Sequence, residues 1–321
     1  MKRSLLKNLS FILVLILVVG AIVACGKKAQ DTTTKPTAAP SKEAEPTKAE
    51  DIKKNIKIKI GSKDFTENLI LAELYALALE DKGYKVDRVF NLASAVVHTT
   101  LVSGDIDLYP EYTGTGLLSV LKLPLETDPQ KVYDTVKAEY EKKFNLVWLD
   151  YAKANDGQGL VISTKAATKF GIKTISDLQK NASNLRFASQ GEFDTREDGI
   201  PALTKTYGEF KWKSSKVYDN GLKYQVLKND EADVAVAYTT EGQLVDNTYT
   251  LLEDDKQVWP PYNIAPVISK KVLDANPDIA DILNGIDAKI DTKTITALNA
   301  KVDVDKQEFE EVAKEFYDTI K

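Results

Sequence analysis

The stretch that best predicts the fold is Leu101–Gly114, which reads LVSGDIDLYPEYTG. Here a helix end and an acidic turn lead into a short apolar strand that ends in a Tyr-Thr pair. A second stretch, Leu227–Thr239 (LKNDEADVAVAYT), has the same order and also ends in a Tyr-Thr pair. In open α/β sheets, ligands bind beyond the carboxyl ends of the strands. The two stretches therefore predict two similar α/β lobes with a ligand-binding cleft between them.

Strand and helix patterns alternate on both sides of these stretches. Residues 56–60 alternate apolar and polar side chains as in a half-buried strand. Apolar residues then recur at helical spacing up to Asp81, and Thr66 is the predicted N-cap of this helix. Further strands are predicted at residues 85–90, 106–109, 185–189, 216–218 and 232–238, and helices at 94–103, 199–208 and 222–229. Such alternation is typical of α/β layers with a mainly parallel sheet.

The first 24 residues have the pattern of a secretory signal peptide. Three basic residues and no acidic one lie within residues 1–10, and residues 11–24 are almost wholly apolar. A membrane-spanning helix needs about 20 apolar residues, so this run is too short to cross a bilayer comfortably. We therefore expect residues 1–24 to be a signal peptide.

Cys25, the only cysteine of the chain, follows the apolar run at once. Its setting, Ile22-Val23-Ala24-Cys25, resembles a bacterial lipobox, which predicts lipidation at Cys25. Residues 26–54 are mostly Lys, Thr, Ala, Pro, Glu and Ser, a composition that cannot offset the entropy of folding. Residues 25–54 are thus expected to be a lipidated, disordered tether that holds a body of residues 55–321 at a membrane.

Charge and motif content argue against several classes of function. The formal net charge is −5 and the body has no basic stripe, so nucleic acid is not an expected partner. His98 is the only histidine, and there is no zinc motif, phosphate-binding loop or dinucleotide fingerprint. We expect no metal, no cofactor and no catalytic residue, although a carboxylate pair for glycoside hydrolysis remains open because acidic residues are plentiful.

The chain is rich in tyrosine, with 14 residues against one methionine. Tyr109, Tyr112, Tyr238 and Tyr262 lie beside turns rather than within apolar periods. A quaternary ammonium group donates no strong hydrogen bond and is held instead by aromatic ring faces, each contributing about 0.5–2 kcal/mol. Tyrosines grouped around a cleft would suit such a cation.

Several motifs of the body resemble a known family. They are Ile60–Asn68 (IGSKDFTEN), Gly104–Gly116 (GDIDLYPEYTGTG), Lys173–Leu178 (KTISDL), Glu192-Phe193 with Arg196–Gly199 (REDG), and Pro260–Val267 (PPYNIAPV). Together they resemble the osmoprotectant substrate-binding proteins of ABC importers, which take glycine betaine, carnitine or choline. The resemblance covers the body from Ile56 onward.

The resemblance implies a two-lobed α/β architecture, the type II periplasmic-binding-protein-like fold, with a hinge that the chain crosses twice. It places residues 55–157 and 263–321 in lobe I and residues 158–262 in lobe II. The two lobes would close on the ligand by a hinge motion.

The resemblance also implies the site residues. An aromatic cage for the ammonium group would include Tyr112, Tyr238 and Tyr262. The ligand carboxylate would meet Lys63, Thr115 and Arg196. Of these, Arg196 is the strongest candidate, because a guanidinium group can hold a carboxylate through two parallel hydrogen bonds.

One segment departs from the family pattern. Family members carry a tyrosine just after the first lobe, where this chain has Gln158 within Asn155–Leu160 (NDGQGL). The cage for glycine betaine is then weaker, or the pocket is larger and takes a bulkier or more polar betaine such as carnitine or ergothioneine. Thr115 favours a zwitterion over a choline-type cation, and Asp156 favours additional positive charge on the ligand.

The resulting hypothesis is a non-enzymatic solute-binding component of an ABC importer. It would be extracytoplasmic, lipid-anchored to the outer face of the cell membrane and monomeric in its body. It would deliver a betaine-like ligand to a separate membrane permease driven by a cytoplasmic ATPase. Two alternatives remain open: a surface lipoprotein that serves as a sensor or adhesion module, and an extracellular hydrolase that uses carboxylates.

Overall fold

The structure is a computed structural model that describes residues 57–321. The expected signal peptide (1–24), the lipidation site Cys25 and the tether (25–54) lie outside the described residues. Among the helices of residues 57–321, none combines the length and the apolar character that a membrane span requires.

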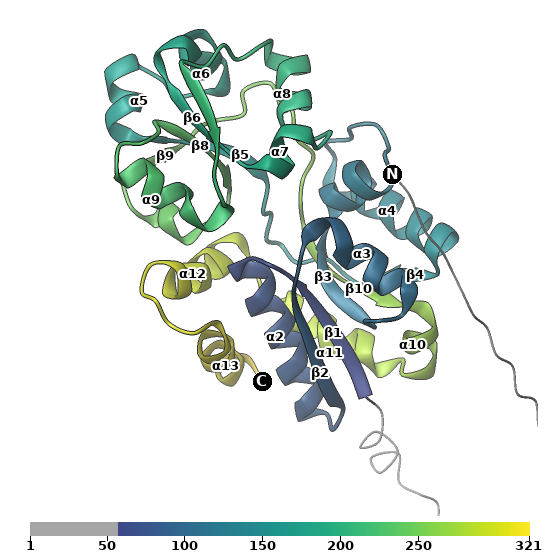
Figure 1. Ribbon diagram of the computed structural model, residues 1–321. Coiled ribbons are helices and arrows are strands. Elements are labelled where there is room, and N and C mark those ends of the chain that lie inside the picture. Colours follow the sequence, from purple (N-terminus) through teal and green to yellow (C-terminus); the bar gives the residue numbers. More distant parts are fainter. Residues whose placement is uncertain (1–56) are drawn as a thin grey trace, which may run out of the picture. The chain divides into compact units, whose positions relative to one another are not determined.

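One five-stranded sheet forms from the beginning and the end of the described chain (Figure 1). Its strand order is β2-β1-β3-β10-β4. The strands are β1 (Lys57–Lys63), β2 (Lys85–Leu92), β3 (Leu108–Tyr112), β4 (Leu146–Trp148) and β10 (Ile264–Ser269).

The middle of the chain forms a second five-stranded sheet with the order β7-β6-β8-β5-β9. Its strands are β5 (Gln158–Ser163), β6 (Arg186–Ser189), β7 (Ser214–Val217), β8 (Val234–Tyr238) and β9 (Tyr249–Leu251). The two orders correspond strand for strand, with β3 and β8 both at the centre. The predicted two-lobed α/β fold of the type II binding-protein class is therefore confirmed.

The prediction of mainly parallel sheets is confirmed, because in each sheet four strands run in the same direction and one runs against them. β1 is parallel to β2 and β3, and β6 is parallel to β7 and β8. By contrast, β10 is antiparallel to β3 and β4, and β5 is antiparallel to β8 and β9. β5 is the first strand after the chain crosses into the second sheet, and β10 is the first strand after it returns to the first sheet. The alternation of apolar and polar residues does not reveal that these two strands run in the reverse direction.

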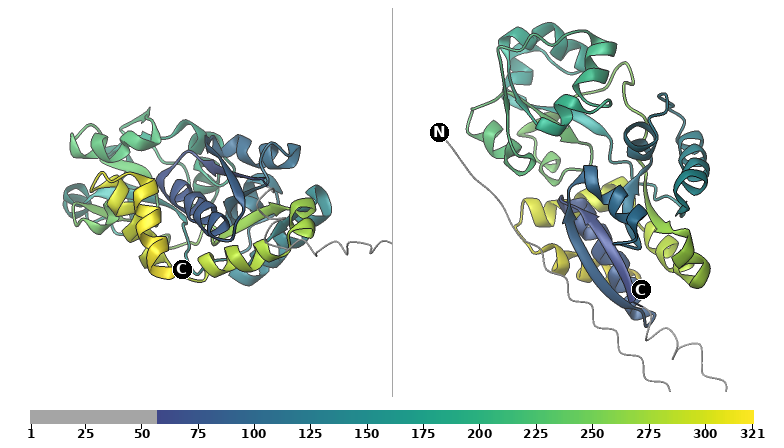
Figure 2. Two further views of the ribbon diagram at one scale, coloured as in Figure 1. Left: turned by 90° about the horizontal axis from the view of Figure 1, so that it is seen from below. Right: turned by 45° about the vertical axis from the view of Figure 1, so that its right-hand side comes forward.

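Helices cover both faces of the first sheet (Figures 1 and 2). They are α2 (Thr66–Asp81), α3 (Ser94–Ser103), α4 (Pro129–Phe144), α10 (Lys270–Ala275), α11 (Asp278–Asp287), α12 (Thr292–Asp303) and α13 (Phe309–Ile320), with a π-helical turn η1 (Thr115–Val120). Helices α11, α12 and α13 pack against α2, so the end of the chain returns to its beginning. Thr66 begins α2 but does not cap it: Phe65 is the N-cap, and the Thr66 hydroxyl donates to Asp303 at 2.5 Å.

The second sheet carries shorter helices. They are α5 (Thr164–Phe170), α6 (Ile175–Asn181), α7 (Gly191–Thr195), α8 (Ile200–Tyr207) and α9 (Lys223–Lys228), with 3₁₀ turns η2 (Ala182–Asn184), η3 (Asn220–Leu222) and η4 (Gly242–Val245). α6 begins with a capping box in which Thr174 and Asp177 satisfy each other's backbone N–H groups. Turn η4 packs against α12, which belongs to the first sheet's helices.

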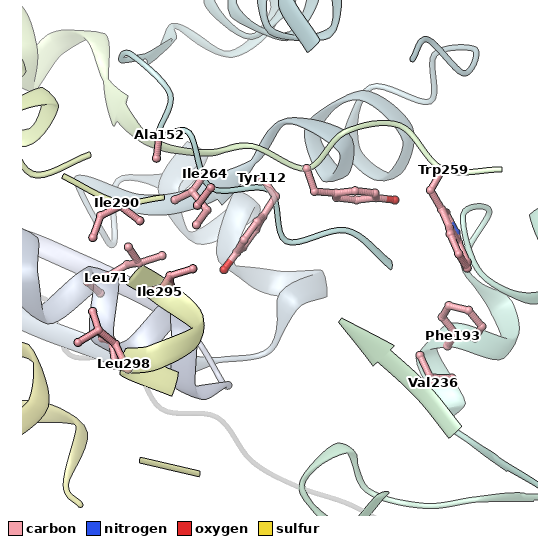
Figure 3. Packing of buried hydrophobic residues seen from close by; sticks show 14 of the residues in the cluster. Leu71, Tyr112, Ala152, Phe193, Val236, Trp259, Ile264, Ile290, Ile295 and Leu298 are labelled. Atoms are coloured by element: carbon pink, nitrogen blue, oxygen red, sulfur yellow. The ribbon is translucent and has the colours of Figure 1, made fainter. Parts of the chain in front are cut away.

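The central strands are apolar on both faces, as expected of strands covered by helices on each side. In β10, Ile264 and Ile268 join one buried cluster, while Ala265 and Val267 join another. The larger cluster extends through both parts of the fold, from Leu71 beside α12 to Trp259 (Figure 3). Each fully buried large apolar side chain of this kind contributes about 1.5–3 kcal/mol to folding.

Two connections join the sheets, residues 149–157 and 252–263, and they are hydrogen-bonded to each other. The Asp156 N–H donates to the Tyr262 carbonyl at 3.0 Å, and the Tyr262 N–H donates to the Asn155 side chain at 2.6 Å. Asn155 and Asn263 also form an isolated antiparallel bridge. The two crossings of the hinge thus run side by side, which places the segments that carry Gln158 and Tyr262 next to each other.

Candidate functional site

One cavity collects all of the ligand-binding residues that the sequence predicts. It has a volume of about 30 Å³. Its lining consists of the seven predicted residues, Lys63, Tyr112, Thr115, Gln158, Arg196, Tyr238 and Tyr262, together with Phe65, Ser94 and Asp156. Lys63, Tyr112 and Tyr238 are the last residues of β1, β3 and β8. The cavity therefore lies where the strand ends of both sheets meet, as the repeated Tyr-Thr stretches predict.

Three of the aromatic rings that line the cavity are neighbours. The Phe65 ring centroid lies 6.0 Å from that of Tyr112 and 6.2 Å from that of Tyr238, and the planes of Phe65 and Tyr238 differ by 9°. Sequence reasoning missed Phe65 as a site residue, although it lies in the 60–68 motif two residues after Lys63. Its ring adds aromatic surface that the glutamine at position 158 does not supply.

Tyr262 reaches the cavity from the second crossing and packs against Gly114. A Cβ atom at Gly114 would lie 2.7 Å from the Tyr262 ring, so only glycine allows this contact. The Tyr262 hydroxyl donates to Asp198 at 2.7 Å. Burial, reinforced by the charge of Asp198, raises the pKa of Tyr262 well above its ordinary value, so the phenol stays a donor.

Lys63 is buried and its charge is balanced within the protein. Its ammonium group forms an ion pair with the buried carboxylate of Glu111. Glu111 also accepts a hydrogen bond from Tyr109 at 2.8 Å. The Lys63 Nζ atom lies 4.8 Å from the centroid of the Tyr112 ring. A ligand carboxylate would thus share Lys63 with Glu111.

Arg196 follows α7 and is held by Asp198, which sequence reasoning missed. Its Nε and Nη2 donate to the two carboxylate oxygens of Asp198 at 2.8 and 2.7 Å. Burial raises the pKa of Asp198, but the hydrogen bonds and charge of Arg196 outweigh this and hold the pKa below its usual value. Burial lowers the pKa of Arg196, and Asp198 more than offsets that effect. Both groups are therefore ionised.

The pairing decides which edge of the guanidinium is available. Asp198 occupies the Nε–Nη2 edge, while Nη2 makes a long contact of 3.4 Å with the Ser119 hydroxyl in η1. Nη1 lies 3.8 Å from Glu192, which is half-exposed. A ligand carboxylate would accordingly meet the Nη1–Nη2 end of Arg196.

A larger cavity of about 530 Å³ adjoins the site on the Arg196 side. Thr115, Ser94 and Arg196 line both cavities, and Ser119 and Lys122 line the larger one. Hydroxyl groups and cations suit a carboxylate. His98 also lines this space, where burial lowers the pKa of its imidazole and the ring lies 4.7 Å from Phe144.

Another cavity of about 290 Å³ adjoins the site through Phe65, Asp156 and Tyr238. Four acidic side chains line it, Glu67, Asp156, Glu241 and Asp303, together with Lys306 and Lys223, and Lys223 is ion-paired with Glu241. The site thus adjoins one cavity rich in carboxyl groups and another lined by hydroxyl groups and the Arg196 guanidinium. Aromatic rings and a guanidinium group in one cavity suit a zwitterion, whose cation packs on rings and whose carboxylate accepts hydrogen bonds.

Glu67 and Asp156 are a buried pair that meets at one hydroxyl group. The Thr240 Oγ1 atom lies 2.5 Å from Glu67 and 2.7 Å from Asp156. A hydroxyl has a single proton, so it cannot donate to both. Burial raises the pKa of both carboxyl groups, which favours a proton on the pair. Asn299 donates to Glu67 at 2.9 Å, which ties the pair to α12.

Within residues 57–321, no group of three or more His, Cys, Asp or Glu side chains is arranged to hold a metal ion. The chemistry of the described cavity is that of ring faces, one anchored guanidinium, hydroxyl groups and acidic side chains. These groups can recognise and orient a small charged molecule.

Comparisons with known proteins agree with this geometry. The model of a family described as the substrate-binding domain of ABC-type glycine betaine transport systems matches residues 56–319. An ergothioneine transport permease/ergothioneine-binding protein of Helicobacter pylori is 34% identical over 264 residues, which are 81% of this chain and 47% of that protein. The chain thus spans about half the length of this relative.

Two further relatives are matched over most of their length. A glycine-betaine-binding protein of Pseudomonas aeruginosa is 35% identical over 269 residues, covering 81% of this chain and 86% of that protein. A solved structure titled as a glycine betaine/carnitine/choline ABC transporter has a TM-score of 0.69 and 29% identity, covering 82% of this chain and 98% of that one.

Proposed function

Because the chain belongs to the family of substrate-binding domains of ABC-type glycine betaine transport systems, we propose that it captures a quaternary ammonium zwitterion for an ABC importer. The observation that carries this proposal is that Phe65, Tyr112, Tyr238 and Tyr262 line the same cavity as the Arg196 guanidinium. Members of the family are transport binding domains, so the prediction that the chain is not an enzyme is confirmed.

In the proposed complex, the ammonium methyl groups lie against the rings of Phe65, Tyr112 and Tyr238. Each ring face contributes about 0.5–2 kcal/mol, more when water is excluded. Tyr262 completes the wall. The carboxylate accepts hydrogen bonds from the free end of Arg196 and from Thr115, with Lys63 adding positive charge.

Entry of the ligand requires the lobes to separate. A cavity of about 30 Å³ holds one or two water molecules, which is less than a betaine needs. We infer that residues 55–157 with 263–321 and residues 158–262 move as two rigid lobes about the two crossings. Opening would break the contacts between Arg196 and Ser119 and between Thr240 and Glu67.

The partners and location follow from the same proposal. An ABC importer needs a membrane permease and a cytoplasmic ATPase, and this chain would act outside the cytoplasm as a monomer that delivers the ligand to them. The signal-like residues 1–24 and the lipobox-like setting of Cys25 support a lipid anchor on the outer face of the membrane. Labelling of growing cells with a radioactive or clickable fatty acid tests this: the chain should be labelled, and its Cys25→Ser variant should not.

Isothermal titration calorimetry tests the cargo. The ligands are glycine betaine, carnitine, choline, proline betaine and ergothioneine. At least one zwitterion should bind in the micromolar range, which corresponds to about −8 kcal/mol. If none of the five binds, the proposed cargo class is wrong, while the family assignment stands on its own evidence.

A further inference from the structure

The side-chain carbonyl of Gln158 is a buried acceptor for which residues 57–321 offer no donor. Gln158 is 5% exposed, and its Oε1 atom has no hydrogen-bond partner among the described residues. Buried polar groups are nearly always paired, and leaving one unpaired costs about 1–3 kcal/mol. Because Gln158 lines the binding cavity, the donor for Oε1 has to come from solvent or from the ligand.

The orientation of this amide is determined by Asp198. The Nε2 atom of Gln158 lies 3.4 Å from the Oδ2 atom of Asp198, to which it donates. The flipped amide would bring two acceptors together, since Asp198 is ionised and its pKa is held below the usual value. An amide in which Nε2 faces the carboxylate necessarily presents Oε1 as an acceptor.

Gln158 lines the cavity beside Tyr238 and beside Asp198, the anchor of Arg196. It is directly opposite Tyr238 in the antiparallel ladder between β5 and β8. Side chains of directly opposite residues project from the same face of a sheet and are neighbours. Asp156, two residues earlier, lines the same cavity. The acceptor therefore lies beside an aromatic wall of the cavity.

Resting on the proposed function, we propose that the ligand carries a hydrogen-bond donor, an N–H or O–H group, in addition to its quaternary ammonium and carboxylate groups. Glycine betaine has only methyl, methylene and carboxylate groups and donates no such bond. On binding, it displaces the solvent that Gln158 Oε1 would otherwise use and leaves this acceptor unpaired. A betaine with a hydroxyl group or an azole N–H satisfies it.

A matched pair of ligands tests the proposal on the unaltered full chain. Carnitine and γ-butyrobetaine have the same length and charges, and only carnitine has a hydroxyl group. Ergothioneine, which has azole N–H groups, and glycine betaine are titrated beside them. We expect carnitine to bind about tenfold more tightly than γ-butyrobetaine, or ergothioneine about tenfold more tightly than glycine betaine, the gain from one satisfied buried acceptor.

Gln158→Met is the matching variant, because it keeps the length of the side chain and removes the acceptor. It also removes the Nε2 donor to Asp198, whose loss affects every zwitterion alike, so the difference between ligands with and without a donor reports the acceptor. The variant should weaken the preferred donor-bearing ligand about tenfold relative to γ-butyrobetaine and glycine betaine, which no longer leave an acceptor unpaired when they bind. Gln225→Met, at an exposed position on α9, is the control for the substitution itself. Thermal unfolding of both variants verifies that they fold.

The outcomes separate this inference from the proposed function. If glycine betaine and γ-butyrobetaine bind as tightly as ergothioneine and carnitine, the donor requirement is wrong, while a betaine receptor remains. Equal losses for all ligands in Gln158→Met also overturn it and assign Gln158 only a positioning role. Should no quaternary ammonium zwitterion bind at all, the proposed function fails together with the inference.

Discussion

Tyr262 and Arg196 are anchored to the same buried carboxylate. The Tyr262 hydroxyl donates to Asp198 Oδ2 at 2.7 Å, and Arg196 donates to both oxygens of that side chain. Tyr262, a wall of the proposed cage, and Arg196, the proposed partner of the ligand carboxylate, are thus held by the same side chain. Their relative position is therefore preorganised before a ligand arrives, which reduces the entropy lost on binding.

Replacing this anchor should weaken both folding and binding. Asp198→Asn leaves the buried guanidinium of Arg196 without its counter-charge, and breaking such a pair costs about 3 kcal/mol or more. We expect a lower urea midpoint and a lower affinity for every zwitterion. Asp318→Asn, which removes an exposed partner of Lys314, should leave both measurements unchanged. An unaltered urea midpoint for Asp198→Asn would show that the pair is not important for stability.

The role of Arg196 itself is tested by comparing ligands with and without a carboxylate. Arg196→Ala should weaken glycine betaine and carnitine by about 100-fold, the effect of losing a charge-assisted contact of about 2.7 kcal/mol. Choline, which has no carboxylate, should lose far less. Arg88→Ala, which removes a guanidinium paired with Glu73 and Glu80 away from the cavity, is the control. Equal losses for zwitterions and choline would place Arg196 away from the ligand carboxylate.

Restoring an aromatic ring opposite Tyr238 should shift the preference among betaines. Gln158→Tyr adds a ring face for the ammonium group and removes the unpaired acceptor. Glycine betaine should bind about three- to tenfold more tightly, the gain of one partly buried cation–π contact. Donor-bearing or bulkier betaines should bind less tightly. Calorimetry with both ligand types measures the change. Weaker binding of glycine betaine would contradict the interpretation that Gln158 weakens the cage.

Contact between the lobes at Gly242 offers a test of closure away from the ligand. A Cβ atom at Gly242 would lie 2.5 Å from the backbone of Ala300 in α12, so Gly242→Val prevents this approach. If the ligand binds to the closed state, the affinity for every ligand should fall by a similar factor, because a smaller fraction of the protein is closed. Gly285→Ala, where nothing lies within 4 Å, is the control. A loss confined to one ligand would indicate a local effect instead.

Because of Asp287, the free energy of unfolding of the protein should decrease as the pH rises. The residue is 1% exposed and its carboxyl group accepts from Tyr75 at 2.7 Å, and burial raises the pKa of this carboxyl group well above its ordinary value of 3.8. A raised pKa in the folded state means that the contribution to stability is complete below pH 3.8 and is lost as the pH rises through the folded pKa.

Asp287→Asn removes this titration while keeping an acceptor for Tyr75. The variant should be more stable than the natural chain at pH 8, by about 1 kcal/mol or more, and the difference should shrink toward pH 4. Thermal unfolding at a series of pH values measures this. A difference that stays constant with pH would mean that Asp287 is already ionised in the folded protein.

Local patterns predicted much of the fold. The helix from Ser94 to Ser103 and the strand Arg186–Ser189 are found where periodicity and turn residues indicate them. Tyr112 and Tyr238, the tyrosines of the two Tyr-Thr pairs, do line one cavity at the ends of β3 and β8. The antiparallel placement of β5 and β10 was not predictable, because strand direction depends on which sheet the chain has just left.

The residues of the candidate site also fall into those that the sequence predicted and those that it did not. The motifs around Lys63, Tyr112, Arg196 and Tyr262 identified lining residues, since each motif is contiguous and its chemistry is local. Phe65 was overlooked because an aromatic residue at a helix start is ordinarily a packing residue. Asp198 was overlooked because its importance comes from Tyr262 and Gln158, which are distant in the chain.

The sequence by itself thus determined an α/β chain with a repeated strand-end motif and a set of residues suited to a betaine, because these are properties of short segments and of composition. Only the tertiary structure decided which edge of Arg196 is free and that Gln158 presents an unpaired acceptor. Both depend on Asp198, which is buried where the two crossings and the second sheet come together. Burial and hydrogen-bond partners belong to the folded arrangement, and no local pattern encodes them.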